Sequence, residues 1–396
     1  MVLYPRRLFI LILTFFILFL YVIRYWTLSL DLNSFQFVKF GISANLGELN
    51  FFTLSLFISI QFSLYFLVPE RVTFFVDNKF VNLVQKAFYL ETALLFIAIV
   101  LGARSGVNLG GVERLILFFV YSLVPLNLLY FTLLIVRKNN KLNTILFLIP
   151  SALMASKSGM IFALLIFISV KILKREQLIS LKAFLASFFV LITYPLFIVI
   201  AAYKREGRSD FSNFFFSQLE SMGESVLNVY TFVITSISRR VSGLDVLMIP
   251  QNDDNVVFSV GSISLYLLKG VLTAAFVDGL LGQNSYGIGR MFAIEFLNQD
   301  VGLANGFEPT LFGIVYHSVN PIFVGLELYL SCALTIIFFR YKQGSLANLV
   351  LCYFVFLYSY VFMTGTIVQL LQVFRFYIAL IVIYYFYKRL VWRKSL

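Results

Sequence analysis

Ten long apolar segments follow one another along this chain, and short loops join all but one pair of neighbours. Runs such as Leu115–Val136 and Ala183–Ala202 come close to or exceed the ~20 residues with which a helix crosses ~30 Å of hydrocarbon. The exception to the short loops is the polar stretch Lys204–Pro309, which holds eleven of the 19 acidic residues. This pattern predicts an all-α, polytopic transmembrane bundle of about ten spans, in which that stretch forms a large external loop folded into a helical cap.

The composition supports a membrane protein and argues against several soluble classes. Hydrophobic residues make up 60% of the chain and charged residues only 13%, whereas a soluble domain has about 25% charged residues. The net charge of +12 comes mainly from bases in short loops beside apolar segments, so we expect membrane lipids and no nucleic acid as partners. The chain has no phosphate-binding Gly-rich loop, and its one histidine and two cysteines form no ligand cluster. No cofactor and no metal site are therefore predicted.

Lysines and arginines are concentrated in alternate loops, which determines the expected topology. Eighteen of the 31 bases lie at the termini and in every second loop, against five in the opposite short loops. The positive-inside rule therefore places both termini in the cytoplasm and the long loop outside. The spans are predicted near residues 8–23, 49–68, 87–103, 115–136, 143–156, 158–173, 183–203, 311–339, 346–365 and 367–387.

The segment Asn143–Leu173 is interpreted as two short spans rather than one. A single helix of this length would extend ~46 Å, well beyond the hydrocarbon thickness, and the basic loops on both sides require an even number of crossings. The two spans then meet at residues 156–159, which places Lys157 at or just below the external surface. Its ammonium group is either a snorkelling cation at a helix turn or a cation that faces the external site.

The long loop is too apolar to be a solvated linker. Its segment Val256–Phe276 is interrupted by Gly261, Lys269 and Gly270, which makes it a poor transmembrane span. Helices that lie in the outer interface or fold back over the bundle fit better. The expected division is an N-terminal bundle of about seven spans at residues 1–203, the external loop at residues 204–309, and a C-terminal bundle of about three spans at residues 310–396.

Three segments match a known pattern: SKSGM at residues 156–160, SRRVSGLDVL at residues 238–247, and GLANGFEPTLFGIVYHSVNPIFVG at residues 302–325. Together with the large external loop, they resemble the Wzy-type O-antigen polymerases, also called oligosaccharide repeat-unit polymerases. The resemblance implies a fold related to the GT-C class of membrane glycosyltransferases and a place in the bacterial inner membrane. It also implies undecaprenyl-diphosphate-linked glycans as substrates, with a flippase and a chain-length regulator of the same pathway as partners.

Glycan transfer from a lipid diphosphate needs cations, because the leaving diphosphate develops negative charge. Arginine suits this role, since its planar fork binds phosphate in a bidentate manner. We favour Arg239 and Arg240, which follow a predicted amphipathic helix, although a solvated or lipid-contacting pair is the alternative. Arg375 lies far from both ends of the last span and is expected to face the bundle interior or a water-filled cavity. Further candidates are Arg205 and Arg208, for which an interfacial anchor is the alternative, Arg290, and Lys157, where family members often carry Arg.

The acceptor hydroxyl needs a base, and the candidates are His317 and Glu308. Pro309 favours a helix start at that position, which makes a capping role the alternative for Glu308. Continued as a helix, the segment would carry Thr310 and His317 on one face, with His317 about two turns below the surface. A packing role is the alternative for His317, but a polar residue at such depth is a functional candidate, and we favour it as the base. Thr310 and Tyr316 are candidate glycan-binding residues.

The expected activity is polymerisation of lipid-linked repeat units into O-antigen or capsule. A lipid-linked oligosaccharide flippase or other transporter would explain the spans and intramembrane charges, but transporters typically show repeat symmetry, and the chain shows none. An O-antigen ligase shares the architecture and the donor but uses a lipid A-core acceptor. A sugar O-acetyltransferase would need basic and His motifs in early spans, which hold no histidine here.

Overall fold

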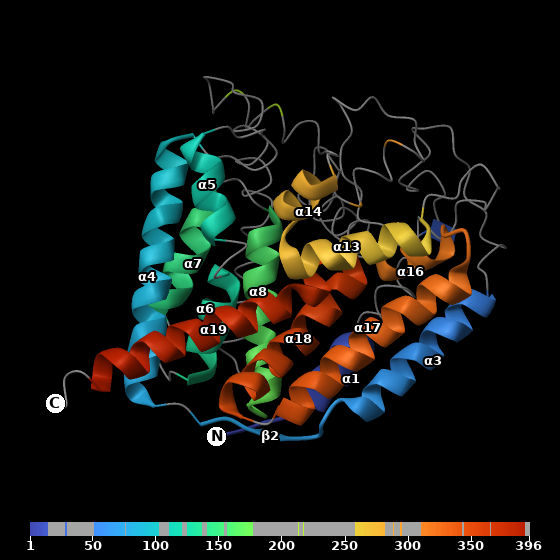
Figure 1. Ribbon diagram of the computed structural model, residues 1–396, viewed down its shortest axis with the longest axis horizontal. Helices are drawn as coiled ribbons and strands as arrows, with labels where there is room; N and C mark the ends of the chain where they lie inside the picture. The colour runs from blue at the N-terminus through green and yellow to red at the C-terminus, as the bar shows by residue number, and fades with distance from the viewer. Residues whose placement is uncertain are drawn as a thin grey trace. The chain divides into compact units, whose positions relative to one another are not determined.

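The computed structural model shows a predominantly helical protein (Figure 1). Four of the described helices are long and apolar enough to cross a membrane, which agrees with the predicted all-α membrane protein at this coarse level. One two-stranded sheet is formed by β1 (Val2–Leu3) and β2 (Val72–Thr73). The structure describes residues 1–14, 28–29, 51–75, 77–102, 111–120, 125–136, 141–153, 157–176, 213, 217, 258–281, 288, 294, 310–342, 344–364 and 366–392.

The chain forms two compact units, and the first comprises Met1–Leu3, Thr73–Thr235 and Phe376–Leu396. Its core is aromatic: Tyr130 stacks on Phe147 with ring centroids 4.3 Å apart, and on Phe88 at 6.3 Å. These three rings come from three different helices, which they hold together. The described helices of this unit are α4 (Asn78–Val100), α5 (Val112–Phe118), α6 (Leu126–Val136), α7 (Lys141–Leu153), α8 (Lys157–Leu173) and the part of the last helix from Phe376 onward.

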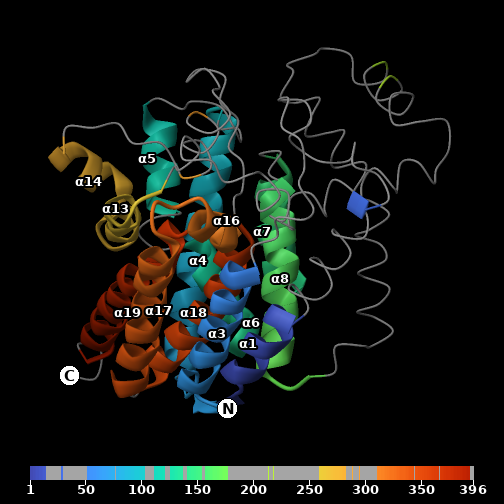
Figure 2. The ribbon, with the colours of Figure 1, turned by 90° about the vertical axis from the view of Figure 1, so that its right-hand side faces the viewer.

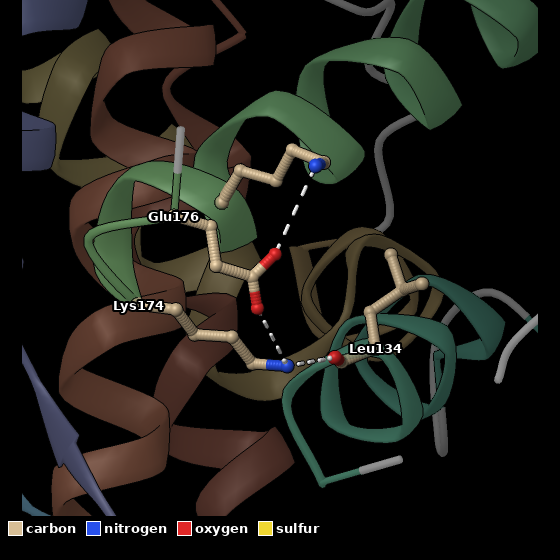
Figure 3. A network of polar contacts seen from close by, with 4 residues as sticks. Leu134, Lys174 and Glu176 are labelled. Carbon is tan, nitrogen blue, oxygen red and sulfur yellow. Dashed lines mark hydrogen bonds and ion pairs between the residues drawn. The ribbon is translucent and has the colours of Figure 1, made fainter. Parts of the chain in front are cut away.

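The end of α8 is tied to the end of α6 by a small polar network (Figure 3). The ammonium group of Lys174 donates to the carbonyl oxygen of Leu134 at 2.8 Å, so it satisfies one of the orphan carbonyls in the last turn of α6. Glu176 lies 3.8 Å from both Lys171 and Lys174. Burial lowers the pKa of the Lys174 ammonium, an effect that the negative charge of Glu176 opposes. The network joins two helix ends that the charge count assigns to the same side.

Two further contacts of the first unit join segments that the charge count places together. The N-terminal ammonium of Met1 donates to the carbonyl oxygen of Phe74 at 3.0 Å. Asp77 caps α4 by accepting from the backbone N–H of Lys79 at 3.2 Å, and its other carboxylate oxygen accepts from the Tyr387 hydroxyl at 2.8 Å. The N-terminal residue and the last part of α19 (Val368–Trp392) therefore both contact the segment at the start of α4.

The second unit comprises Tyr4–Val72 and Ser236–Arg375. Its central helix is α18 (Ser345–Thr364), whose apolar residues are mostly buried, whereas those of α17 (Pro321–Lys342) are about half buried. Phe9 of α1 stacks on Tyr358 of α18 at 5.6 Å, and Gln61 of α3 donates to the same tyrosine hydroxyl. The helices of this unit are α1 (Pro5–Thr14), α3 (Phe51–Leu67), α13 (Val260–Leu272), α14 (Ala274–Leu281), α16 (Thr310–Tyr316), α17 (Pro321–Lys342), α18 (Ser345–Thr364) and the first part of α19.

Helix α13, from the loop that was expected to be external, lies across one end of α17 in both views (Figures 1 and 2). It begins with a capping box in which Ser259 and Ser262 satisfy each other's backbone N–H groups. It ends at Thr273, which has a positive φ of 84°, and α14 follows directly. The interrupted apolar segment 256–276 thus forms short helices rather than one span, as the sequence indicated.

Two predicted spans are wrong as continuous helices. The segment 115–136 contains the separate helices α5 and α6, and Pro125 directly precedes α6, where its missing N–H is tolerated. The segment 311–339 is divided into α16 and α17, because Asn320 caps α17 by accepting from the Phe323 N–H at 3.3 Å and Pro321 is its first residue. Helix α7 ends at Leu153 and α8 begins at Lys157, and residues 154–156 between them, like the predicted span 183–203, lie outside the described residues.

Candidate functional site

His317 lies in the turn between α16 and α17 in the second unit, and it is fully buried. Its backbone N–H donates to the carbonyl oxygen of Gly313 at 2.9 Å, which closes the last turn of α16. Its carbonyl oxygen accepts from the N–H of Phe258 at 3.2 Å, and Val319 donates back to Phe258 at 2.8 Å. Helix α16 runs from Thr310 to Tyr316, so His317 directly follows its last residue, seven positions after Thr310.

The imidazole of His317 is positioned by its neighbours along the turn. The ring of Tyr316 meets it edge-on, with centroids 4.8 Å apart and planes at 89°. The hydroxyl of Ser318 donates to the carbonyl oxygen of Val315 at 2.6 Å and so stabilises the end of α16. Imidazole is the side chain that most readily takes and gives protons near neutral pH. A fixed histidine between two helices, next to an element of the long loop, can serve as a proton acceptor.

Arg375 lies in α19, and its Nε and Nη1 atoms are buried without a hydrogen-bond partner among the described residues. Both atoms carry N–H groups that can donate charge-assisted hydrogen bonds to a phosphate or carboxylate. Leu371 and Val368, one and two turns before Arg375 on the same face of α19, lie against Gly270 of α13. Arg375 is thus the next residue of the α19 face that α13 covers.

Lys269 is a second buried cation. In the sequence it is recognisable only as a charged residue that interrupts an apolar segment. Its side chain is 2% exposed, and its ammonium lies 2.8 Å from Asp278 of α14 and 5.2 Å from the ring centre of Tyr266. The ion pair neutralises the Lys269 ammonium, and it joins α13 to α14. The charge of Lys269 is already used for this contact, whereas the two Arg375 donors have no described partner.

Glu327 of α17 is a further polar residue that sequence reasoning missed. The hydroxyl of Ser264 in α13 donates to its Oε1 atom, while its Oε2 atom is buried without a hydrogen-bond partner in the described part of the chain. The sequence does contain a feature that could have identified it, because Glu327 is the one acidic residue in the predicted span 311–339. An acid within an apolar segment is a functional candidate in the same way as a lone histidine.

The other predicted site residues are placed only in part. Thr310 begins α16 in the second unit and Lys157 begins α8 in the first unit. The second unit therefore brings Thr310, Tyr316 and His317 together on α16 and the turn after it, and it also contains Arg375. The remaining candidates lie outside the described residues: Arg205, Arg208, Arg239, Arg240, Arg290 and Glu308.

Within the described ranges, no group of three or more His, Cys, Asp or Glu side chains could hold a metal ion. Both cysteines, Cys332 and Cys352, are buried free thiols in α17 and α18. In comparisons with family models, with curated proteins and with solved structures, nothing matches this chain.

Proposed function

We propose that this protein is a polysaccharide polymerase of the bacterial inner membrane, with both termini in the cytoplasm and the long loop on the outer side. It would join undecaprenyl-diphosphate-linked oligosaccharide repeat units into a long surface polysaccharide, either O-antigen or capsule. On this proposal the bundle is a membrane glycosyltransferase related to the GT-C class. Its pathway would supply substrate through a flippase and set product length through a chain-length regulator.

One observation carries the proposal: in α19, a helix of membrane-spanning length, two buried donor atoms of Arg375 have no hydrogen-bond partner among the described residues. Arg375 also follows Val368 and Leu371 on the face of α19 that contacts α13. Burying N–H groups of a cation without acceptors is costly, so the site is expected to be completed by an anion. The diphosphate of a lipid-linked glycan is an anion that reaches a membrane helix from the lipid phase. A phosphate group also pairs better with a guanidinium, which can donate two parallel hydrogen bonds, than with an ammonium, which binds as a point charge.

The reaction would proceed at the outer side without a further energy source, because the diphosphate is already an activated leaving group. The oxygen of an acceptor sugar hydroxyl forms a bond to the anomeric carbon of the donor glycan. The bond between that carbon and the diphosphate oxygen breaks, and the electron pair leaves with the diphosphate. Arg375 stabilises the developing negative charge, and the imidazole of His317 takes the proton of the acceptor hydroxyl.

The placement of the described elements supports this assignment. His317, the start of α17 and the start of α19 all belong to the ends that the charge count assigns to the outer side. In the second unit, elements of the long loop contact each of them: Phe258 at His317, Ser264 at Glu327 and Gly270 at Val368. A translocated glycan held by the loop would therefore be close to the candidate base.

Deletion of the gene and gel analysis of the surface glycans test the proposal in the cell. A polymerase mutant should lose the ladder of long chains and keep a single attached repeat unit. Loss of every attached repeat would contradict the proposal, since it would indicate a ligase or a flippase instead. Expression of the intact gene should restore the ladder, and expression of the Arg375→Ala variant should not.

A further inference from the structure

A second polar contact lies where α13 crosses α17, and it involves none of the residues assigned above to the reaction. Glu327 is the one acidic residue of α17, and the hydroxyl of Ser264 donates to its Oε1 atom. The Oε2 atom is buried and has no hydrogen-bond partner among the residues that the structure describes. The carboxylate is therefore held in place by one oxygen, and the other oxygen has an unused capacity to accept hydrogen bonds.

A buried carboxylate oxygen without a donor is unfavourable, because it has lost its hydration and gained nothing in return. A ligand that brings a donor to this oxygen would recover the lost interaction. Sugar hydroxyls are such donors, and hydrogen bonds to charged acceptors are stronger than those between neutral groups. The chemistry of the site thus fits a hydroxyl-rich ligand.

The position of Glu327 along α17 agrees with this ligand. The helix begins at Pro321, directly after the turn that contains His317, and Glu327 lies about 9 Å along the helix axis from its first residue. A group that holds the acceptor glycan must lie within one or two sugar units of the base. Glu327 is in a suitable place to bind a part of the acceptor that does not react.

We infer that Glu327 and Ser264 form a binding site for the acceptor glycan. In this site Oε2 of Glu327 accepts a hydrogen bond from a sugar hydroxyl, while Ser264 orients the carboxylate through Oε1. This inference rests on the proposed function, because that function supplies the acceptor. It adds a binding residue on α17 and a positioning residue on α13, distinct from the base and from the cation.

The site also depends on the long loop. Ser264 belongs to α13, so the carboxylate is oriented only when α13 lies on α17. The other end of this helix contacts α19 through the close approach of Gly270, and the Lys269–Asp278 ion pair joins it to α14. Docking of the loop would thereby assemble the acceptor site, which links a structural feature of the cap to substrate binding.

The test uses the full-length protein in detergent, with purified lipid-linked repeat unit as donor and the same repeat unit on a short alkyl chain as an acceptor that cannot donate. Glu327→Gln keeps an oxygen for Ser264 but removes the charge. It should raise the KM for the acceptor about 10- to 150-fold, with a smaller change in kcat and an unchanged KM for the donor. Ser264→Ala should raise the acceptor KM by about 10-fold or less, because the carboxylate remains.

The control is Glu176→Gln, which removes an exposed carboxylate whose ion pairs are 3.8 Å long and should leave both KM values unchanged. An unchanged acceptor KM in a folded Glu327→Gln protein would overturn the inference. So would equal losses for donor and acceptor, or stabilisation of the wild type alone by a divalent cation, which would indicate a cation site. Calorimetric titration with the alkyl-linked acceptor separates the two proposals. If the wild type binds this acceptor but transfers no glycan, and Glu327→Gln does not bind it, the binding site is supported and the polymerase function is contradicted.

Discussion

Gly270 of α13 lies so close to α19 that a Cβ atom added to it would be 2.4 Å from the carbonyl oxygen of Val368. The same atom would be 3.3 Å from the Cβ atom of Leu371. Only a residue without a side chain permits this approach. The contact fixes an element of the long loop against the helix that carries Arg375, and so connects the cap to the candidate diphosphate site.

Replacing Gly270 with alanine should therefore displace α13 from α19. We expect a loss of about 1–3 kcal/mol in stability, as for other overpacked contacts, together with a lower rate of polymerisation. The matched control is Gly261→Ala in the same helix, where the new Cβ would meet only Ser259 Oγ at 3.9 Å. This control should be neutral or stabilising by about 0.5–1 kcal/mol. Thermal unfolding in detergent measures both, and equal stability of the two variants would contradict the role of the contact.

Arg375 should be needed for turnover rather than for folding. Removing its charge-assisted hydrogen bonds to diphosphate should lower activity about 10- to 150-fold in Arg375→Ala. Arg375→Lys should recover only part of the loss, because an ammonium cannot make the bidentate contact. The control is Arg389→Ala in the exposed last part of the same helix. Full activity of Arg375→Ala would transfer the role to Arg239 and Arg240, whose alanine variants should then show the same loss.

The proton acceptor can be identified by comparing His317→Gln with Glu308→Gln. The hydrogen bonds that join His317 to Gly313 and to Phe258 use its backbone atoms, so a glutamine side chain leaves them intact. Glutamine can bind a hydroxyl but cannot take its proton, so His317→Gln should lose about 10²–10⁴-fold in kcat. Wild-type activity should also fall as the pH drops into the range where imidazole is protonated. Near-normal activity of His317→Gln, with the loss in Glu308→Gln instead, would reverse the assignment.

The contact between Asp77 and Tyr387 predicts a pH dependence of stability. The Tyr387 hydroxyl and the Lys79 N–H lower the pKa of the Asp77 carboxyl below its usual value of 3.8. A carboxylate whose pKa is lower in the folded state stabilises that state above the unfolded pKa, and the contribution is lost as the pH falls through the folded pKa. Tyr387→Phe should therefore unfold at a lower temperature than the wild type at neutral pH. The difference should shrink below pH ~4, and a difference that persists there would contradict the carboxylate contact.

The sequence predicted the class of the fold because that class depends on local patterns. Apolar length and the distribution of bases indicate membrane helices, and they located α18. The break between α16 and α17 was missed, although Asn320 and Pro321 carry the signal of a new helix start. Averaged hydropathy includes the short turn at His317 in one apolar run, and this is why one span was expected.

The site was less predictable, because its contacts connect distant parts of the chain. His317 and Arg375 could be chosen as isolated polar residues within apolar runs. Ser264 and Glu327 are 63 positions apart, and no local pattern indicates that they meet. The pairing of Lys269 with Asp278 depends on the turn between α13 and α14, where Thr273 has an unusual backbone conformation. Contacts of this kind between distant residues can be identified only from the tertiary structure.

The most direct test of the central claim is transfer by the purified protein in lipid vesicles, supplied only with an undecaprenyl-diphosphate-linked repeat unit. The account predicts a ladder of glycans with two or more units on one lipid, together with released undecaprenyl diphosphate. The ladder should be strongly reduced with the Arg375→Ala and His317→Gln proteins. A correctly folded wild-type protein that leaves every lipid with a single repeat unit would contradict the account.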